Sequence, residues 1–210
     1  MPPDRFNLRE ALNLTLVISR REASPRSIFE LAEAAFKGGV TSLQLREKTG
    51  PDREIYQLAC ELAAFCRARK KFFTVNDRAD IAIAAGADGL HLGQNDLPAE
   101  AAAALIPKSM ILGLSVSTLT EAKAAVKAGA DYLGLGAIIA TDSKDDAKII
   151  KSDQISAIIA TRTPAVAIGG ISAANCQQIR ALGFDGLAVI SALAKAEDPE
   201  AVARILAGRS

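Results

Sequence analysis

The chain has 210 residues, of which 50% are hydrophobic and 23% are charged, a composition typical of a folded globular protein. Lys and Arg exceed Asp and Glu by one (25 − 24), Trp is absent and aromatic residues make up 4%, which argues against a nucleic-acid partner. No run approaches about 18 apolar residues, and residues 1–7 lack the apolar stretch of a signal peptide, so we expect neither a membrane span nor secretion.

The cysteines indicate the cellular compartment, and the length indicates the number of domains. Cys60, Cys66 and Cys176 are odd in number and form no C-x-x-C pair, which favours free thiols over disulfides or a zinc site. A reducing compartment follows, and we expect a cytoplasmic protein. At about 150 residues per domain, residues 1–210 predict a single domain.

Short apolar runs rich in β-branched residues recur from one end of the chain to the other. Runs of this kind, without polar alternation, are typical of parallel strands that are covered on both faces. In chain order they span residues 14–18, 42–45, 72–75, 89–92, 110–114, 132–135, 165–168 and 187–190.

Alanine-rich amphipathic segments between these runs predict helices, most clearly over residues 26–36, 53–69, 120–128 and 175–182. A glycine phrase recurs where a helix gives way to a strand, because glycine tolerates the left-handed cap that ends a helix. It occurs at residues 37–40 (KGGV), 85–88 (AGAD), 128–131 (AGAD) and 182–185 (LGFD). Eight alternating units predict a closed (β/α)8 barrel, with a doubly wound open sheet as the alternative.

In such a barrel the active site lies at the carboxyl ends of the strands, where this sequence gathers polar residues. Gln44, Arg46 and Lys48 follow the second strand and alternate, so in an extended chain they point to the same side. An amide and two cations suit a polyanion. The alternative is that Arg46 and Lys48 pair with Glu47 and Asp52 at the surface.

Asp77 and Asp96 follow the third and fourth strands, which are neighbours in the predicted barrel. Two carboxylates beside basic residues predict one Mg²⁺ held jointly with a phosphorylated substrate, because Mg²⁺ takes one or two protein carboxylates and fills its other positions with water and phosphate oxygens. The alternative for Asp77 is an N-cap of the following helix.

Glycines and a serine follow the last two strands. Loops in these positions form the phosphate site of many such barrels, so Gly170, Ile190 and Ser191 are candidates for binding a phosphate through backbone amides. His91, the only histidine, is a candidate base or ligand, but its position within a strand is at least as typical of a residue packed behind the site.

Six motifs, in order and with intact spacing, resemble the thiamine phosphate synthase family over nearly the whole chain. They are residues 44–48 (QLREK), 75–78 (VNDR), 91–98 (HLGQNDLP), 113–115 (GLS), 167–171 (AIGGI) and 188–191 (AVIS). The resemblance implies a (β/α)8 enzyme that joins a hydroxymethylpyrimidine diphosphate to a thiazole phosphate, giving thiamine monophosphate and pyrophosphate. These small molecules and Mg²⁺ are the expected partners, and the sequence leaves homo-oligomer formation open.

The resemblance also implies a role for each matching residue. Gln44 would contact the pyrimidine, and Ser115 would contact the leaving group or the pyrimidine. It assigns the diphosphate to Arg46, Lys48, Asn76 and Lys144, Mg²⁺ to Asp77 and Asp96, and the thiazole phosphate to Thr141, Ser143, Gly170, Ile190 and Ser191. The residues with implied catalytic roles are Arg46, Lys48, Ser115 and Lys144.

Two departures from the family pattern keep alternatives open. Residues 136–144 (GAIIATDSK) lack the two prolines and the aromatic residue that are usual there, and Ser117 stands where the family commonly has histidine. A related thiazole tautomerase uses that histidine as an acid and base. A non-catalytic paralogue that binds thiazole phosphate is the other alternative.

Overall fold

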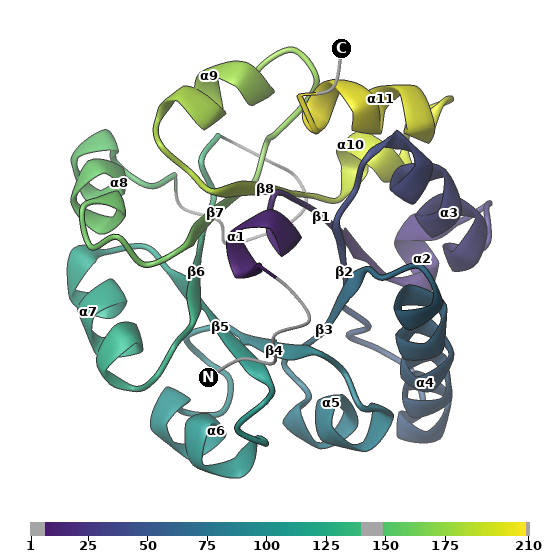
Figure 1. Ribbon diagram of the computed structural model, residues 1–210, viewed down its shortest axis with the longest axis horizontal. Helices are drawn as coiled ribbons and strands as arrows, with labels where there is room; N and C mark the ends of the chain where they lie inside the picture. The colour runs from purple at the N-terminus through teal and green to yellow at the C-terminus, as the bar shows by residue number, and fades with distance from the viewer. Residues whose placement is uncertain (1–6, 140–148, 209–210) are drawn as a thin grey trace.

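The computed structural model describes residues 7–139 and 149–208. Their eight strands form one closed barrel in which every strand pairs in parallel with the next along the chain, and β8 pairs with β1 (Figure 1). The strands are β1 (Leu14–Ile18), β2 (Ser42–Leu45), β3 (Phe72–Asn76), β4 (Gly89–Leu92), β5 (Ile111–Val116), β6 (Tyr132–Leu135), β7 (Ala165–Ile168) and β8 (Gly186–Val189). The fold is therefore a (β/α)8 barrel, as the alternating pattern predicts.

The helices surround this barrel as an outer ring, apart from α1, which lies across one end of it (Figure 1). They are α1 (Leu8–Ala11), α2 (Arg20–Ala23), α3 (Ile28–Gly38), α4 (Asp52–Ala68), α5 (Ala79–Ala85), α6 (Ala99–Leu105), α7 (Leu119–Lys127), α8 (Ser152–Ile159), α9 (Cys176–Ala181), α10 (Ser191–Ala194) and α11 (Pro199–Leu206). No helix within the described residues is long and apolar enough to span a membrane.

Local sequence fixes where several helices begin and end. Ser27 and Glu30 form a capping box that starts α3, and Gly39 ends that helix in the left-handed region with φ of 113°. Thr118 and Glu121 form the same box at the start of α7. Each box accepts hydrogen bonds from backbone amides that have no partner inside the helix. These bonds fix the residue at which the helix begins.

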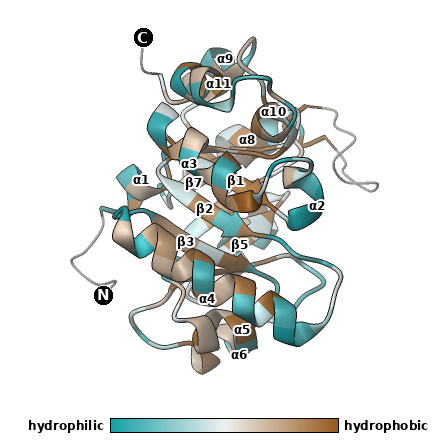
Figure 2. Ribbon diagram, turned by 90° about the vertical axis from the view of Figure 1, so that its right-hand side faces the viewer, coloured by the Kyte–Doolittle hydropathy of each residue, from teal (hydrophilic) through white to brown (hydrophobic). Residues whose placement is uncertain are grey.

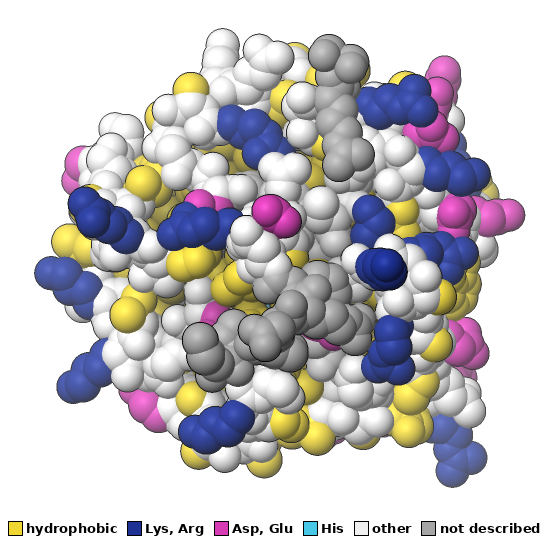
Figure 3. All heavy atoms as spheres, viewed as in Figure 1, with side chains coloured by type: hydrophobic (Ala, Val, Ile, Leu, Met, Phe, Trp, Pro, Cys, Tyr) yellow, Lys and Arg dark blue, Asp and Glu magenta, His cyan; other side chains and the backbone are white. Residues whose placement is uncertain are grey.

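The apolar core has two layers, one outside and one inside the barrel. The outer layer packs the strands against the helices and includes fully buried residues such as Leu43, Leu62 and Leu90. The inner layer fills the amino end of the barrel with Phe72, Tyr132 and other residues beside α1. Figures 1 and 2 show α1 across this end, with α2 on the opposite side, so the carboxyl end remains for the site. In Figure 3, Lys and Arg side chains are scattered over the amino-end face and form no single basic patch there.

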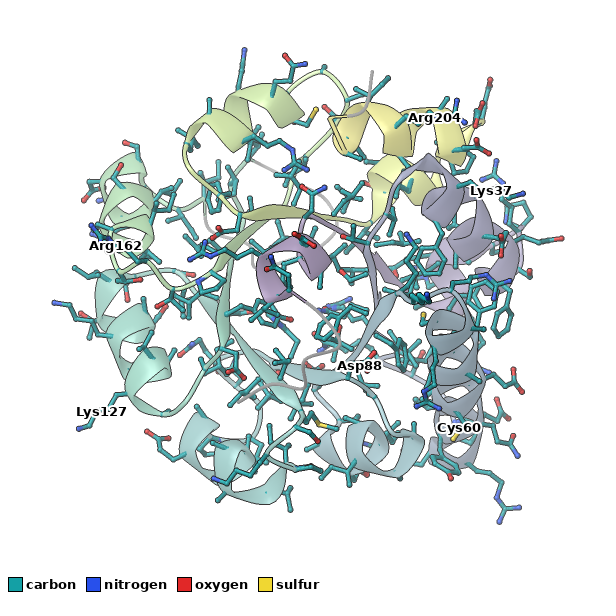
Figure 4. All side chains as sticks on the ribbon, viewed as in Figure 1. Lys37, Cys60, Asp88, Lys127, Arg162 and Arg204 are labelled. Atoms are coloured by element: carbon teal, nitrogen blue, oxygen red, sulfur yellow. The ribbon has the colours of Figure 1, made fainter. Side chains whose placement is uncertain are left out.

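The aspartates of the glycine phrase join neighbouring strands at the amino end. Each accepts a backbone hydrogen bond from the preceding strand: Asp88 from Phe73 at 3.0 Å, Asp131 from Leu112 at 2.8 Å and Asp185 from Ala165 at 2.9 Å. Figure 4 shows Asp88 inside the ring of helices, whereas the labelled Lys37, Cys60 and Lys127 lie on the outer surface. The recurring phrase is therefore a repeated structural device.

The three cysteines are free, as their number and spacing predict. Cys66 and Cys176 are buried in the outer core layer. Burial raises the pKa of the Cys66 thiol to about 12, so this side chain stays protonated and behaves as a small apolar residue.

Candidate active site

A cavity inside the barrel collects polar side chains near the carboxyl ends of the strands. Gln44, Arg46, Asn76 and Ser115 line it, together with Ile190 at the end of β8. The Gln44 side chain is 7% exposed, and its amide makes no hydrogen bond with another described residue. Arg46 likewise makes no ion pair with a described residue, so an amide and a guanidinium are available to a ligand in one cavity.

Asp77 and Asp96 come together at the rim, as their positions after adjacent strands predict. Asp77 has a φ of 65°, a left-handed conformation that Asp tolerates, and its amide donates to the carbonyl of His91 at 2.9 Å. The Asp96 carboxylate accepts the Gly93 amide at 2.7 Å, a hydrogen bond within the loop after β4. Lys48 forms an ion pair with Asp77.

The two carboxyl groups influence each other's protonation. Burial raises the pKa of the Asp77 carboxyl above its usual value, helped by the hydrogen bond that it shares with Asp96 and opposed by Lys48. Burial opposes ionisation of Asp96 too, but the hydrogen bonds from Asp77 and the Gly93 amide outweigh it and lower the Asp96 pKa. Asp77 is therefore the member of the pair that holds a proton to the higher pH.

The structure shows neither of the alternatives, an N-cap role for Asp77 or pairing of Arg46 and Lys48 with Glu47 and Asp52. Arg78, and not Asp77, occupies the N-cap of α5, without a side-chain capping bond. Asp52 pairs with Arg78, and Glu47 pairs with Arg20, so neither acid is the partner of Arg46 or Lys48. Lys48 turns toward the acid pair instead.

The loops after β7 and β8 offer backbone amides. Gly169 and Gly170 have φ values of 100° and 68°, a conformation that favours glycine, and Asn175 Nδ2 donates to the Gly170 carbonyl at 2.8 Å. Ile190 is the N-cap of the short helix α10, which starts at Ser191. The amides of Gly170, Ile190 and Ser191 donate to no other described residue, so they are open to an anion, although the lining of the cavity includes only Ile190 of the three.

Three predicted site residues, Thr141, Ser143 and Lys144, lie outside the described residues. Their roles therefore stay predictions. The described chain ends before them at Ile139, whose side chain is 39% exposed, and hydrogen bonds from the Ile138 and Ile139 amides to β7 and Gly169 hold that end.

Contacts around Ser115 were not predicted from the sequence. His91 Nε2 lies 3.0 Å from Ser115 Oγ, and its Nδ1 lies 2.9 Å from the Tyr132 hydroxyl. Gln94 Nε2 donates to the Ser115 carbonyl at 2.6 Å. His91 thus contacts a predicted site residue and lines the same cavity from within β4. The only sequence signal for Tyr132 is a polar aromatic residue in an otherwise aliphatic strand.

The donor set at the rim fits a magnesium ion. Asp77 and Asp96 supply two carboxylates, and the described residues contain no cluster of three or more acids, histidines or cysteines that would favour another metal. Two carboxylates that share a hydrogen bond repel each other when both are ionised, and a divalent cation between them would remove that repulsion.

Comparisons with known proteins agree with this arrangement. The family model "Thiamine monophosphate synthase" matches residues 14–193. A thiamine-phosphate synthase of Chlorobium limicola is 48% identical over 185 residues, 87% of this chain and 88% of that protein. Another, of Natronomonas pharaonis, is 46% identical and covers 91% of this chain and 92% of its own.

A solved structure extends the agreement to three dimensions. The thiamine phosphate pyrophosphorylase of Pyrococcus furiosus superposes with a TM-score of 0.87 at 40% identity, over 95% of this chain and 96% of that one. The likeness therefore includes the whole barrel and the strands that carry the rim residues. The chain belongs to the thiamine monophosphate synthase family and is an enzyme.

Proposed function

We propose that this enzyme joins 4-amino-2-methyl-5-hydroxymethylpyrimidine diphosphate to 4-methyl-5-(2-hydroxyethyl)thiazole phosphate, with Mg²⁺, and forms thiamine monophosphate and pyrophosphate. The observation that carries the proposal is the cluster of Lys48, Asp77 and Asp96 beside a cavity lined by Arg46 and Asn76. Two cations and a carboxylate pair suit a diphosphate that arrives with a divalent metal.

The proposed reaction makes the diphosphate the leaving group. The bond between the pyrimidine methylene carbon and the diphosphate oxygen breaks, and both bonding electrons leave with pyrophosphate. The nitrogen lone pair of the thiazole then forms the new C–N bond to the methylene cation, which the aminopyrimidine ring stabilises. This sequence needs no strong base, in keeping with a chain whose single histidine is buried.

Two cationic side chains would stabilise the negative charge that develops on the leaving diphosphate. Arg46 presents a planar guanidinium that can bind two oxygens of the leaving group, and Lys48 adds a point charge on a flexible stem. Fixed cations of this kind stabilise a transition state in which negative charge grows on the departing oxygen. Asp77 and Asp96 would hold Mg²⁺, and the chemistry that Mg²⁺ supplies when bound is neutralisation of that charge.

The remaining roles divide the two substrates across the cavity. Gln44 is suited to the pyrimidine, because its buried amide can both donate and accept and has no partner among the described residues. The amides of Gly170, Ile190 and Ser191 are suited to the thiazole phosphate, since backbone amides at a glycine turn and a helix start bind phosphate readily. Thr141, Ser143 and Lys144 would complete these pockets.

Neither alternative function gains support from the described residues. Ser117 stands where the tautomerase would need its histidine. A non-catalytic thiazole-phosphate binder would have no use for a second, metal-linked anion site, whereas Asp77, Asp96 and Lys48 are held together at the rim.

The direct test is to mix the purified protein with both substrates and Mg²⁺ and to measure thiamine monophosphate. We expect product that disappears with EDTA and returns when Mg²⁺ is added in excess. Asp80→Asn should form product as wild type does, because Asp80 is an exposed acid that pairs with Arg78 outside the site. Absence of product in every condition would contradict the proposal, and product that survives EDTA would contradict its metal.

A further inference from the structure

Three polar side chains from neighbouring strands form a continuous hydrogen-bonded row inside the barrel. The Tyr132 hydroxyl lies 2.9 Å from His91 Nδ1, and His91 Nε2 lies 3.0 Å from Ser115 Oγ. All three side chains line the cavity; Tyr132 and His91 are buried, at 3% and 8% exposed, and Ser115 is half-buried. The row therefore starts in the apolar interior and ends at a predicted site residue.

Glycines make this row sterically possible. Gly113 pairs in register with His91 on one side and with Tyr132 on the other. A Cβ atom at Gly113 would overlap the Tyr132 ring, and a Cβ atom at Gly134 would lie 2.9 Å from His91 Cε1. The barrel thus leaves out two side chains so that the phenol of β6 can reach the imidazole of β4 across β5.

The direction of the hydrogen bonds follows from the phenol. A buried hydroxyl needs an acceptor for its proton, and His91 Nδ1 is the acceptor that the described residues offer Tyr132. Burial raises the pKa of Tyr132 above its usual value, so the phenol keeps the proton that it donates. An imidazolium would donate from both nitrogens and leave the phenol proton without this acceptor.

With Nδ1 accepting, the imidazole proton is on Nε2 and is donated to Ser115 Oγ. We propose that Tyr132 and His91 are positioning residues that hold the Ser115 hydroxyl so that its own proton points into the cavity, as a donor to an acceptor atom of the pyrimidine diphosphate. This inference rests on the proposed function for the identity of the substrate. The Gln94 bond to the Ser115 carbonyl fixes the backbone of the same residue.

The tautomer can be measured without any substrate. His91 is the only histidine, so uniformly ¹⁵N-labelled protein without a histidine tag gives one pair of imidazole nitrogen signals. Long-range ¹H–¹⁵N correlation should show a protonated Nε2 and an unprotonated Nδ1. A proton on Nδ1, or on both nitrogens, would overturn the proposal, whether or not the protein makes thiamine monophosphate.

The functional link is tested by a double-mutant cycle. Removing one hydrogen bond of about 0.5–1.5 kcal/mol corresponds to a fall of about 2- to 10-fold in kcat for Tyr132→Phe. If Tyr132 acts through Ser115, the same substitution made in Ser115→Ala should change kcat by less than about 2-fold. An equal loss in both backgrounds would show that Tyr132 acts on the barrel generally, which contradicts the proposal.

A matched control separates positioning from stability. Thr15 Oγ1 and Ser42 Oγ form a buried hydrogen bond of 2.6 Å between β1 and β2, two strands that carry no member of the row, and they line the same cavity. Thr15→Val removes a buried hydroxyl from the same barrel and should leave kcat unchanged. A fall in kcat as large as that of Tyr132→Phe would overturn the special role of the row.

Discussion

At the amino end of the barrel, each aspartate of the glycine phrase accepts a backbone amide from a preceding strand, and at the carboxyl end two aspartates bind each other. The first group consists of Asp88, Asp131 and Asp185, and Asp185 also forms an ion pair with Arg9. The second consists of Asp77 and Asp96, which share a hydrogen bond beside Lys48.

Aspartate therefore has a structural role at one end of the barrel and a proposed cation-binding role at the other. An aspartate that accepts a backbone amide satisfies the hydrogen-bonding needs of the fold by itself. A pair of aspartates in contact raises the free energy of the protein when both are ionised, and that cost is relieved by a cation. This distinction predicts that substitutions at the carboxyl end lower activity and that substitutions at the amino end lower stability.

The largest expected effect is on turnover at the carboxyl end. Asp96→Ala should lower kcat/KM for thiamine monophosphate formation by more than about 100-fold, because it removes one of two carboxylates that would hold the metal. The melting temperature should stay within a few degrees of wild type. Turnover that survives the substitution would remove Asp96 from the site.

A smaller loss is expected from the cation at the same end. Lys48→Ala should lower kcat/KM by about 10- to 100-fold, which corresponds to one charge-assisted hydrogen bond of about 1.5–3 kcal/mol to the diphosphate. Lys127→Ala is the control, because Lys127 lies at the outer end of α7. Equal behaviour of the two variants in steady-state kinetics would contradict the assignment of Lys48.

At the amino end the expected loss is of stability. Asp131→Ala leaves the buried Leu112 amide without its acceptor, which should lower the free energy of unfolding by about 1–3 kcal/mol. Asp131→Asn keeps an acceptor and should lose less. Thermal or urea unfolding measures both, and a loss of turnover without a loss of stability would contradict the structural role.

The smallest effect is a pH dependence of that stability. Burial raises the pKa of Asp131 above its ordinary value of 3.8, so the folded state favours the protonated acid. The stability that comes from this preferred protonation is therefore complete below the ordinary value and is lost as pH rises through the folded pKa, whereas the hydrogen bond from the Leu112 amide remains. The melting temperature of wild type relative to Asp131→Asn should fall over this interval, and a constant or rising difference would contradict it.

Most of the barrel could be predicted from the sequence because a strand that is buried on both faces is a continuous apolar run. The apolar runs locate each strand to within one or two residues, although β5 extends past Ser115 to Val116 and β8 starts at Gly186. Short helices carry no comparable mark, since α1, α2 and α10 have four residues each and complete little more than one turn. Their positions depend on packing against the barrel.

The site was predictable where neighbouring strands end together. Asp77, Asp96 and Lys48 meet because they follow adjacent parallel strands. The contact of His91 with Tyr132 could not be predicted, because β4 and β6 are not neighbours and the contact depends on the missing side chain of Gly113. The sequence shows that Gly113 has no side chain, but it does not show which neighbouring side chain occupies the space beside it.

The most direct test of the distinction between the two ends is a thermal unfolding measurement with Mg²⁺ and pyrophosphate on wild type, Asp77→Ala and Asp131→Ala. At about 100 times the dissociation constant, bound ligand should raise the melting temperature of wild type by about 5–10 °C. We predict the same rise for Asp131→Ala, from a lower starting temperature, and no rise for Asp77→Ala. A full rise in Asp77→Ala, or its loss in Asp131→Ala, would contradict the account.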